Sequence, residues 1–396
     1  MSEQVSSQAQ DHSLTSIVII SILGTVGLAQ LMILPIMSGA FVDYRGLSDQ
    51  AVGWIASANF AGIALVSIVV SLKIHHWRLV PIGLIGMGVL MLADMLTLFV
   101  TDLSAVLGLR FLAGIGGGAV SAAVMSAIAR TAVPERGYAI FVVLQFGLAA
   151  VGLYLLPLVL RWQALEGLLL VLVALEAATL VLAVKLSLFE GEQEQVQLET
   201  EVLLGKPAML SLLAICLFEA GNASIWTYVE RIGSVTGIGA EQVGTILSLA
   251  SILSIPCAFA VVLIGIRWGR LLPLTVGIGA AAVAMIGLGQ SDGTLTFATS
   301  VLLFNAAWAF TLPYFQGLQA DIDHTGSVVV AGQFATMLGA SLGPLLASQL
   351  VGQGSYLPGI NLAFGFYVLS WLAIYPVVVL LRRHFSSLGS DSSVRA

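Results

Sequence analysis

The stretch from Leu103 to Arg130, LSAVLGLRFLAGIGGGAVSAAVMSAIAR, decides the fold because it is long and apolar enough to cross a lipid bilayer. A helix rises about 1.5 Å per residue, so roughly 20 apolar residues span a hydrocarbon core of about 30 Å. Arg110 lies inside this stretch, and a guanidinium among lipid tails is costly unless it faces a partner or a water-filled cavity. The stretch therefore predicts a membrane helix beside a polar interior.

The same stretch carries a smooth packing face. Gly114 and Gly118 lie four residues apart, and this small-xxx-small spacing lets two membrane helices approach closely. We therefore expect this helix to contact a neighbour along its glycines.

The composition of the whole chain is that of a membrane protein. Of its 396 residues, 58% are hydrophobic and only 9% are charged, with a mean hydropathy of +1.02, whereas about a quarter of the residues in a soluble domain carry charge. The formal charge of −6 does not indicate nucleic-acid binding, because the acidic excess is concentrated in one connecting segment. The composition predicts an all-α polytopic membrane protein.

About twelve apolar segments of the chain have spanning length. The connections between most of them are short, which forces consecutive helices to run antiparallel. The expected limits of the segments are 16–40, 50–72, 79–100, 104–129, 137–160, 164–188, 207–230, 241–265, 271–290, 294–318, 327–351 and 359–382.

The Lys and Arg residues of the connections indicate the orientation. With both termini in the cytoplasm, eleven of these residues lie inside and three (Arg45, Arg161 and Arg231) lie outside, as the positive-inside rule requires. We expect a multi-pass protein of a bacterial inner (plasma) membrane. Its expected parts are a cytoplasmic tail (1–15), an N-terminal six-helix bundle (16–188), an acidic cytoplasmic linker (189–206), a C-terminal six-helix bundle (207–383) and a cytoplasmic tail (384–396).

The two halves are related in sequence. GLSDQAVG at 46–53 opens the second segment, and GIGAEQVG opens the eighth 191 residues later. Pro81 and Pro273, and also Gly147 and Gly339, are 192 residues apart at matching places in their halves. Three matches at nearly one offset indicate a six-helix unit duplicated in parallel.

Two six-helix repeats, with RFLAGIGGGAV at 110–120 and the basic turn RWGR at 267–270, resemble the major facilitator superfamily. The resemblance covers nearly the whole chain and implies a secondary transporter. Two signatures of that superfamily are missing: the stretch 73–78 lacks the usual acidic residue, and the fifth segment lacks the Gly-Pro pair of drug and proton antiporters. The second difference argues against drug efflux.

The resemblance also implies a central cavity lined by the first, fourth, seventh and tenth segments. These segments carry polar or aromatic stripes at helical spacing, and a mostly apolar wall with a few polar groups is typical of a small-molecule site. The candidate cavity residues are Gln30, Arg110, Asn222, Trp226, Asn305 and Trp308.

Glu219, in the seventh segment, is the candidate for proton coupling. A carboxylate near the middle of a membrane segment loses its hydration, so it can exchange protons near neutral pH. The alternative is a hydrogen bond to a neighbouring helix that serves packing. The functional role is favoured because carboxylates within membrane segments are functional by default.

Arg110 has two candidate roles. It can bind an anionic substrate or tune Glu219, or it can form a structural ion pair with Asp94. Asp94 lies eight residues before Asp102 and Arg110 lies eight residues after it, so an antiparallel hairpin places both charges at similar depth. If the pair forms, Arg110 is less free to bind substrate. Glu176, midway along the sixth segment, is interpreted as structural because the implied cavity excludes that helix.

No nucleotide-binding loop and no metal-ligand spacing is found in the sequence, so we expect no enzyme activity, cofactor or metal. The predicted function is transport of a small organic solute by alternating access, as proton symport of an anionic or zwitterionic metabolite. Two alternatives stay open: a proton-driven efflux antiporter of drugs or metabolites, and a transport-inactive membrane sensor or scaffold. The expected partners are the solute, a proton or another ion, and the lipid bilayer, without nucleic acid, and we expect a monomer.

Overall fold

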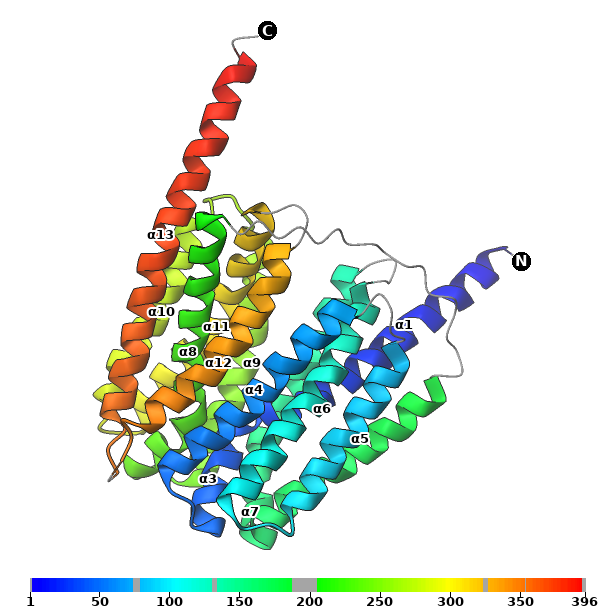
Figure 1. Cartoon of the computed structure of the whole chain (residues 1–396), viewed down its shortest axis with the longest axis vertical. Coiled ribbons are helices and arrows are strands. Elements are labelled where there is room, and N and C mark those ends of the chain that lie inside the picture. The colour runs from blue at the N-terminus through cyan, green and yellow to red at the C-terminus, as the bar shows by residue number, and fades with distance from the viewer. Residues whose placement is uncertain are drawn as a thin grey trace. The chain divides into compact units, whose positions relative to one another are not determined.

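The computed structural model describes residues 2–73, 79–129, 134–186, 205–322, 327–352 and 354–393, and this part of the chain is almost entirely α-helical (Figure 1). The predicted all-α class is therefore confirmed. The helices of the described part are α1 (Ser2–Gly27), α2 (Ala29–Met32), α3 (Leu34–Arg45), α4 (Asp49–Lys73), α5 (Leu79–Thr97), α6 (Leu103–Ala129), α7 (Pro134–Leu186), α8 (Lys206–Val235), α9 (Ala240–Ile264), α10 (Leu271–Gly289), α11 (Thr294–Ile322), α12 (Ser327–Ser348) and α13 (Leu357–Ser393).

Nine helices of the described part are long and apolar enough to cross a membrane. Most helices begin and end within a few residues of the predicted segments, as α4 does at Asp49–Lys73 for the segment 50–72. The predicted linker 189–206 lies outside the described residues except for its last two positions.

The first predicted segment, 16–40, is interrupted rather than continuous. The backbone leaves helical geometry at Leu28 and again at Ile33, where φ is −101° and ψ is 9°. Pro35, the second residue of α3, has no N–H to donate, and its ring clashes with the carbonyl of Leu31 in a continuous helix. The proline therefore explains why a new helix begins at Leu34.

The fifth and sixth predicted segments, 137–160 and 164–188, lie within α7. The chain changes direction inside α7 because Gln163 and Ala164 leave helical geometry. Ala164 has φ 51° and ψ −152°, a region that is strained for any residue with a Cβ. α7 is thus two membrane helices joined without an intervening loop.

The chain divides into two compact units, each described by itself below. Unit 1 comprises residues 1–197 and 239–252, and unit 2 comprises residues 198–238 and 253–396. The bundle boundaries expected from the sequence stay predictions.

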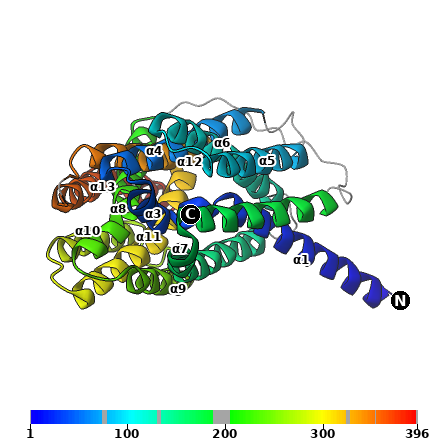
Figure 2. The ribbon, with the colours of Figure 1, turned by 90° about the horizontal axis from the view of Figure 1, so that it is seen from below.

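In unit 1, α6 lies alongside α4 and α5 (Figures 1 and 2). A Cβ atom at Gly114 would lie 2.0 Å from the backbone oxygen of Asn59 on α4, and one at Gly116 would lie 2.6 Å from the backbone oxygen of Gly86 on α5. These contacts require glycine. The predicted glycine packing face of α6 is confirmed, and it serves two neighbouring helices.

The turn between α5 and α6 is held at both sides. The Asp102 carboxylate accepts hydrogen bonds from the Ser104 hydroxyl and, at 3.1 Å, from the Ala105 N–H, and these bonds hold the pKa of Asp102 below its ordinary value. Arg45 donates to two backbone oxygens of the turn at 3.1 and 3.2 Å. The turn thereby fixes the register of α5 against α6.

In unit 2, α8 packs against α12 and α13. Cβ atoms at Gly339 and Gly343 of α12 would lie 2.0 and 2.1 Å from the backbone oxygens of Cys216 and Ala220. The Ser370 hydroxyl of α13 donates to the Ala214 oxygen at 2.7 Å. The middle of α8 is therefore enclosed by neighbouring backbones.

Candidate functional site

The first cluster of buried polar groups lies in unit 1, around Arg110 of α6. Arg110 Nη2 lies 2.6 Å from Asp94 Oδ1 of α5, and neither side chain has exposed surface. The same nitrogen donates to Thr97 Oγ1 at 2.6 Å and to the Ala93 backbone oxygen at 3.3 Å. A buried ion pair needs such additional hydrogen bonds to offset the loss of hydration.

Two amide side chains complete this cluster. Gln30 Nε2 lies 2.7 Å from each carboxylate oxygen of Asp94, and Gln30 Oε1 accepts a hydrogen bond of 2.9 Å from Asn59 Nδ2. Asn59 also donates to the Arg110 backbone oxygen at 3.2 Å. Sequence reasoning missed Asn59 and Thr97. The signal available for Asn59 was an amide in the middle of an apolar segment.

These contacts bear on the two predicted roles of Arg110. Its guanidinium is fully buried and bonded to Asp94, and Gln30 is only 3% exposed. Arg110 therefore makes the contacts of an ion pair and presents no surface to a solute in this arrangement. Its Nε and Nη1 atoms are buried without hydrogen-bond partners among the described residues.

The second cluster lies in unit 2, around Glu219 in the middle of α8. Glu219 is 4% exposed, and its Oε1 accepts a hydrogen bond of 3.0 Å from Trp308 Nε1 of α11. In the described part of the chain, no cationic side chain pairs with Glu219. An ionised carboxylate without a cationic partner is costly in an apolar interior.

Tyr367 of α13, which sequence reasoning also missed, faces the same region. Its hydroxyl is buried without a hydrogen-bond partner in the described residues and lies within electrostatic reach of Glu219. Its ring packs against Phe218, with centroids 5.5 Å apart. An apolar stretch such as YVLSW gave no signal that this tyrosine faces a carboxyl group.

The remaining predicted cavity residues lie on α8 and α11. Asn305 is buried, and its Nδ2 has no hydrogen-bond partner among the described residues. It precedes Trp308 by three residues, about one helical turn. Asn222 and Trp226 are half-buried on α8, one and two turns beyond Glu219. Of the cavity residues predicted on α8 and α11, Trp308 is the one that donates the hydrogen bond to Glu219 described above.

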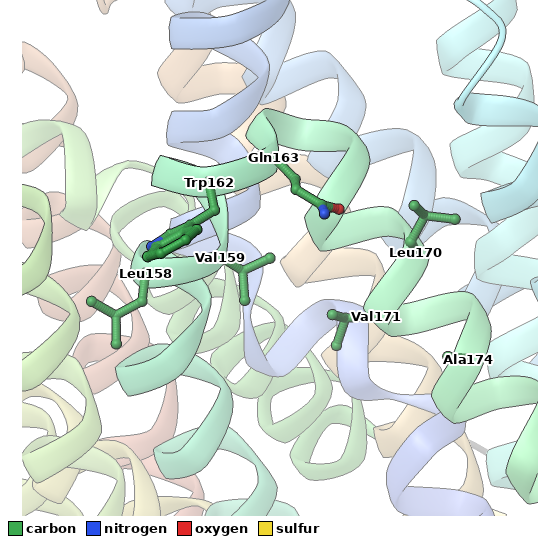
Figure 3. Close-up of a pocket in the computed structure, with 8 residues that line it drawn as sticks. Leu158, Val159, Trp162, Gln163, Leu170, Val171 and Ala174 are labelled. Atoms are coloured by element: carbon green, nitrogen blue, oxygen red, sulfur yellow. The ribbon is translucent and has the colours of Figure 1, made fainter.

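A groove of about 480 Å³ lies at the reversal inside α7, in unit 1 (Figure 3). Leu158, Trp162, Gln163 and Leu170 are among its lining residues, and no predicted cavity residue lines it. The Trp162 side chain is 87% exposed, as expected at a lipid-facing surface near the end of a membrane helix. The groove carries no argument for a solute site.

No group of His, Cys, Asp or Glu side chains in the described residues could hold a metal ion. Long apolar helices that enclose ionisable side chains are those of a multi-pass membrane protein with functional polar groups in its interior. The family model described as Major Facilitator Superfamily matches residues 19–344. The chain belongs to this superfamily, as the sequence resemblance indicated.

Solved transporter structures share the fold. A mutant of the nucleoside transporter NupG has a TM-score of 0.75 at 12% identity, covering 91% of this chain and 98% of that chain. A bacterial homologue of the human lysosomal transporter Spinster, inward-facing and occupied, has a TM-score of 0.71 at 14% identity, covering 94% of this chain and 97% of that chain. No curated protein matches the sequence.

Proposed function

We propose that this protein is a proton-coupled symporter of a small organic solute, in which Glu219 binds the coupled proton. The observation that supports coupling is the position of Glu219: mid-helix, buried, held by the Trp308 indole and without a cationic partner in the described residues. Membership of the superfamily supports secondary transport by alternating access. We further propose a monomer in a bacterial inner membrane, with both termini in the cytoplasm.

A carboxyl group in this position can couple two events. When it is protonated, the neutral acid fits the apolar surroundings of α8. When it is ionised, the Trp308 N–H stabilises its charge at 3.0 Å, but the lost hydration is not otherwise replaced. The charged form therefore requires water or a solute group beside it, which links proton release to exposure of the site.

For the solute we propose an anionic or zwitterionic metabolite. The support is no longer Arg110, which is bonded to Asp94, but the donors on α11. Asn305 Nδ2, which has no hydrogen-bond partner within the described ranges, can donate to a carboxylate or carbonyl oxygen, and the half-buried Trp308 offers an aromatic face one turn away. A few donors on a mostly apolar wall suit a small acid with an apolar body.

The test uses purified full-length protein in two stages. Thermal unfolding is first screened against carboxylic acids and amino acids, because a ligand at about 100 times its Kd adds about 2.7 kcal/mol to stability. Each stabilising compound is then added to proteoliposomes that contain a pH-sensitive dye. Addition to wild-type vesicles should acidify the lumen.

The decisive variant is Glu219→Gln. It should still be stabilised by the same compound, since the amide preserves the shape of the site, but it should no longer acidify the lumen. Asp292→Asn, at an exposed carboxylate, is the matched control and should behave as wild type. Acidification by Glu219→Gln at the wild-type rate would exclude Glu219 as the coupling group. If no compound stabilises the protein and Glu219→Gln leaves the phenotype of the cell unchanged, the membrane sensor or scaffold is favoured.

A further inference from the structure

Glu176, in the second helix of α7, is a buried ionisable group that neither the ion pair nor the proposed transport mechanism uses. It is 1% exposed, and both of its carboxyl oxygens lack a hydrogen-bond donor among the described residues. A fully enclosed carboxyl group without a donor is costly when ionised. The neighbouring groups in unit 1 must therefore show how this carboxyl group is stabilised.

Glu176 faces the Asp94 cluster. Its carboxyl group lies within hydrogen-bonding reach of the Asp94 carboxyl and within electrostatic reach of Arg110, and α7 packs against both α5 and α6. Of the residues that the structure describes, the charged groups that meet here are Asp94 from α5, Arg110 from α6 and Glu176 from α7. The other side chains bonded to the cluster, Gln30, Asn59 and Thr97, are neutral.

Counting charges shows what is missing. Within the described part of the chain, two carboxylates and one guanidinium leave this buried cluster with one negative charge in excess. Two carboxylate oxygens can only accept hydrogen bonds, so the Asp94 and Glu176 groups repel each other when both are ionised. A single proton removes the excess charge and turns the repulsion into a hydrogen bond.

The contacts also indicate where this proton lies. Asp94 already accepts hydrogen bonds from Gln30 Nε2 and Arg110 Nη2, which stabilise its ionised form. Glu176 receives none from the residues described. The arrangement that satisfies the most atoms is a protonated Glu176 that donates its O–H to Asp94.

We propose that Asp94 and Glu176 together bind one proton, which makes the Arg110 cluster of unit 1 a second proton-binding site in addition to the one proposed at Glu219 of unit 2. The proposal rests on the contacts within unit 1 and is independent of solute transport. Loss of the proton leaves the cluster with a net negative charge, so occupancy of this site controls the electrostatics inside unit 1.

The test is infrared spectroscopy of the full-length protein at neutral pH, in the carbonyl-stretch region of protonated carboxylic acids. Glu219→Gln serves as the background, so that the other proposed proton site does not contribute. Adding Glu176→Gln should remove the intensity of one protonated carboxyl group, and the lost band should shift in D₂O. Adding Asp292→Asn instead should leave the spectrum unchanged.

Glu176→Gln should fold, because its amide N–H can replace the carboxyl O–H toward Asp94, and size-exclusion and thermal unfolding check this. If it does not fold, Asp94→Asn carries the test: Arg110 then pairs with an ionised Glu176, so the same band should be lost. A spectrum that Glu176→Gln or Asp94→Asn leaves unchanged would overturn the proposal, whatever the outcome for Glu219.

Discussion

At the scale of single residues, Arg110 shows what an arginine requires inside a membrane protein. Its Nη2 atom makes three hydrogen bonds, to a carboxylate, a hydroxyl and a backbone oxygen, and Asp94 is held in turn by Gln30. Both charged groups are enclosed, and they are bonded to each other. Removal of one member therefore leaves the others buried without compensation, whereas removal of a complete pair does not.

Arg110→Met should lower the free energy of unfolding by about 3–5 kcal/mol, because it leaves Asp94 as an unpaired buried charge. The double variant Arg110→Met with Asp94→Leu should recover most of this loss. Denaturant unfolding in detergent micelles measures both. Arg267→Met, at an exposed arginine, is the control and should change stability little. Equal losses in the single and double variants would show that the pair itself is not the source of the effect.

Sequence reasoning reached this cluster only in part. Equal distances from Asp102 predicted that Asp94 and Arg110 share a depth, because the geometry of a hairpin follows from its length. Asn59 and Thr97 were missed because hydrogen-bond partners on neighbouring helices depend on how the helices rotate against each other. Gln30 was expected to line a cavity, and its hydrogen bond to Asp94 was not foreseen, because helical periodicity gives the face of a helix but not what covers it.

At the scale of helices, backbone contact distinguishes glycines that periodicity treats alike. Gly147 and Gly339 lie at matching places in the two halves of the sequence. A Cβ at Gly339 would lie 2.0 Å from the Cys216 oxygen, whereas one at Gly147 would meet no atom within 4 Å. The same residue type therefore permits close packing at one position and has no neighbour at the other.

Gly339→Ala should destabilise the protein by about 1–3 kcal/mol, since α12 must move away from α8 to make room for the methyl group. Gly147→Ala is the matched control and should stabilise by about 0.5–1 kcal/mol, because alanine is the better helix former and the site is open. Thermal unfolding in detergent compares the two variants. A Gly339→Ala protein as stable as wild type would rule out tight backbone contact between α8 and α12.

The reversal inside α7 is a second feature of this scale: the sequence predicted its place, between the segments 137–160 and 164–188, but not its backbone geometry. Neither Gln163 nor Ala164 is a turn-forming residue, and the segments 137–160 and 164–188 were separated by hydropathy alone. The backbone of Ala164, at φ 51° and ψ −152°, is typical of glycine.

Ala164→Gly should raise the free energy of unfolding by about 1 kcal/mol, because the strain that is released exceeds the entropy cost of glycine. Ala174→Gly, within the helical part of α7, should instead lower it by about 1 kcal/mol. Unfolding midpoints of the two variants give the comparison. Destabilisation by both would mean that position 164 is not strained.

At the scale of the whole molecule, composition and repetition determined the class before any contact was known. The all-α fold followed from the number and spacing of the apolar segments, because the bilayer fixes the length of a spanning helix. The superfamily was indicated by the resemblance of the two six-helix repeats and their motifs. The breaks at Leu28 and Ile33 divide the predicted segment 16–40 into shorter helices, but the segment lies where it was predicted. Contacts made by single side chains could not be obtained in this way.

The direction of coupling belongs to this scale. In proteoliposomes with an acidic exterior, a symporter should accumulate its solute, because protons move inward with it. An alkaline exterior should give no accumulation beyond equilibrium. Uptake of a compound that stabilises the protein measures this, with protein-free vesicles as the control. The opposite dependence on the gradient would identify the efflux antiporter instead.

The short turn between α5 and α6 has a consequence for biogenesis. Arg110 is tolerable in lipid once Asp94 lies beside it, and only 16 residues of chain separate the two. Of the two helices, α5 leaves the ribosome first, and it carries the carboxylate that Arg110 of α6 needs. Both helices should therefore enter the bilayer together as a neutralised hairpin, before the remainder of the polypeptide has been synthesised.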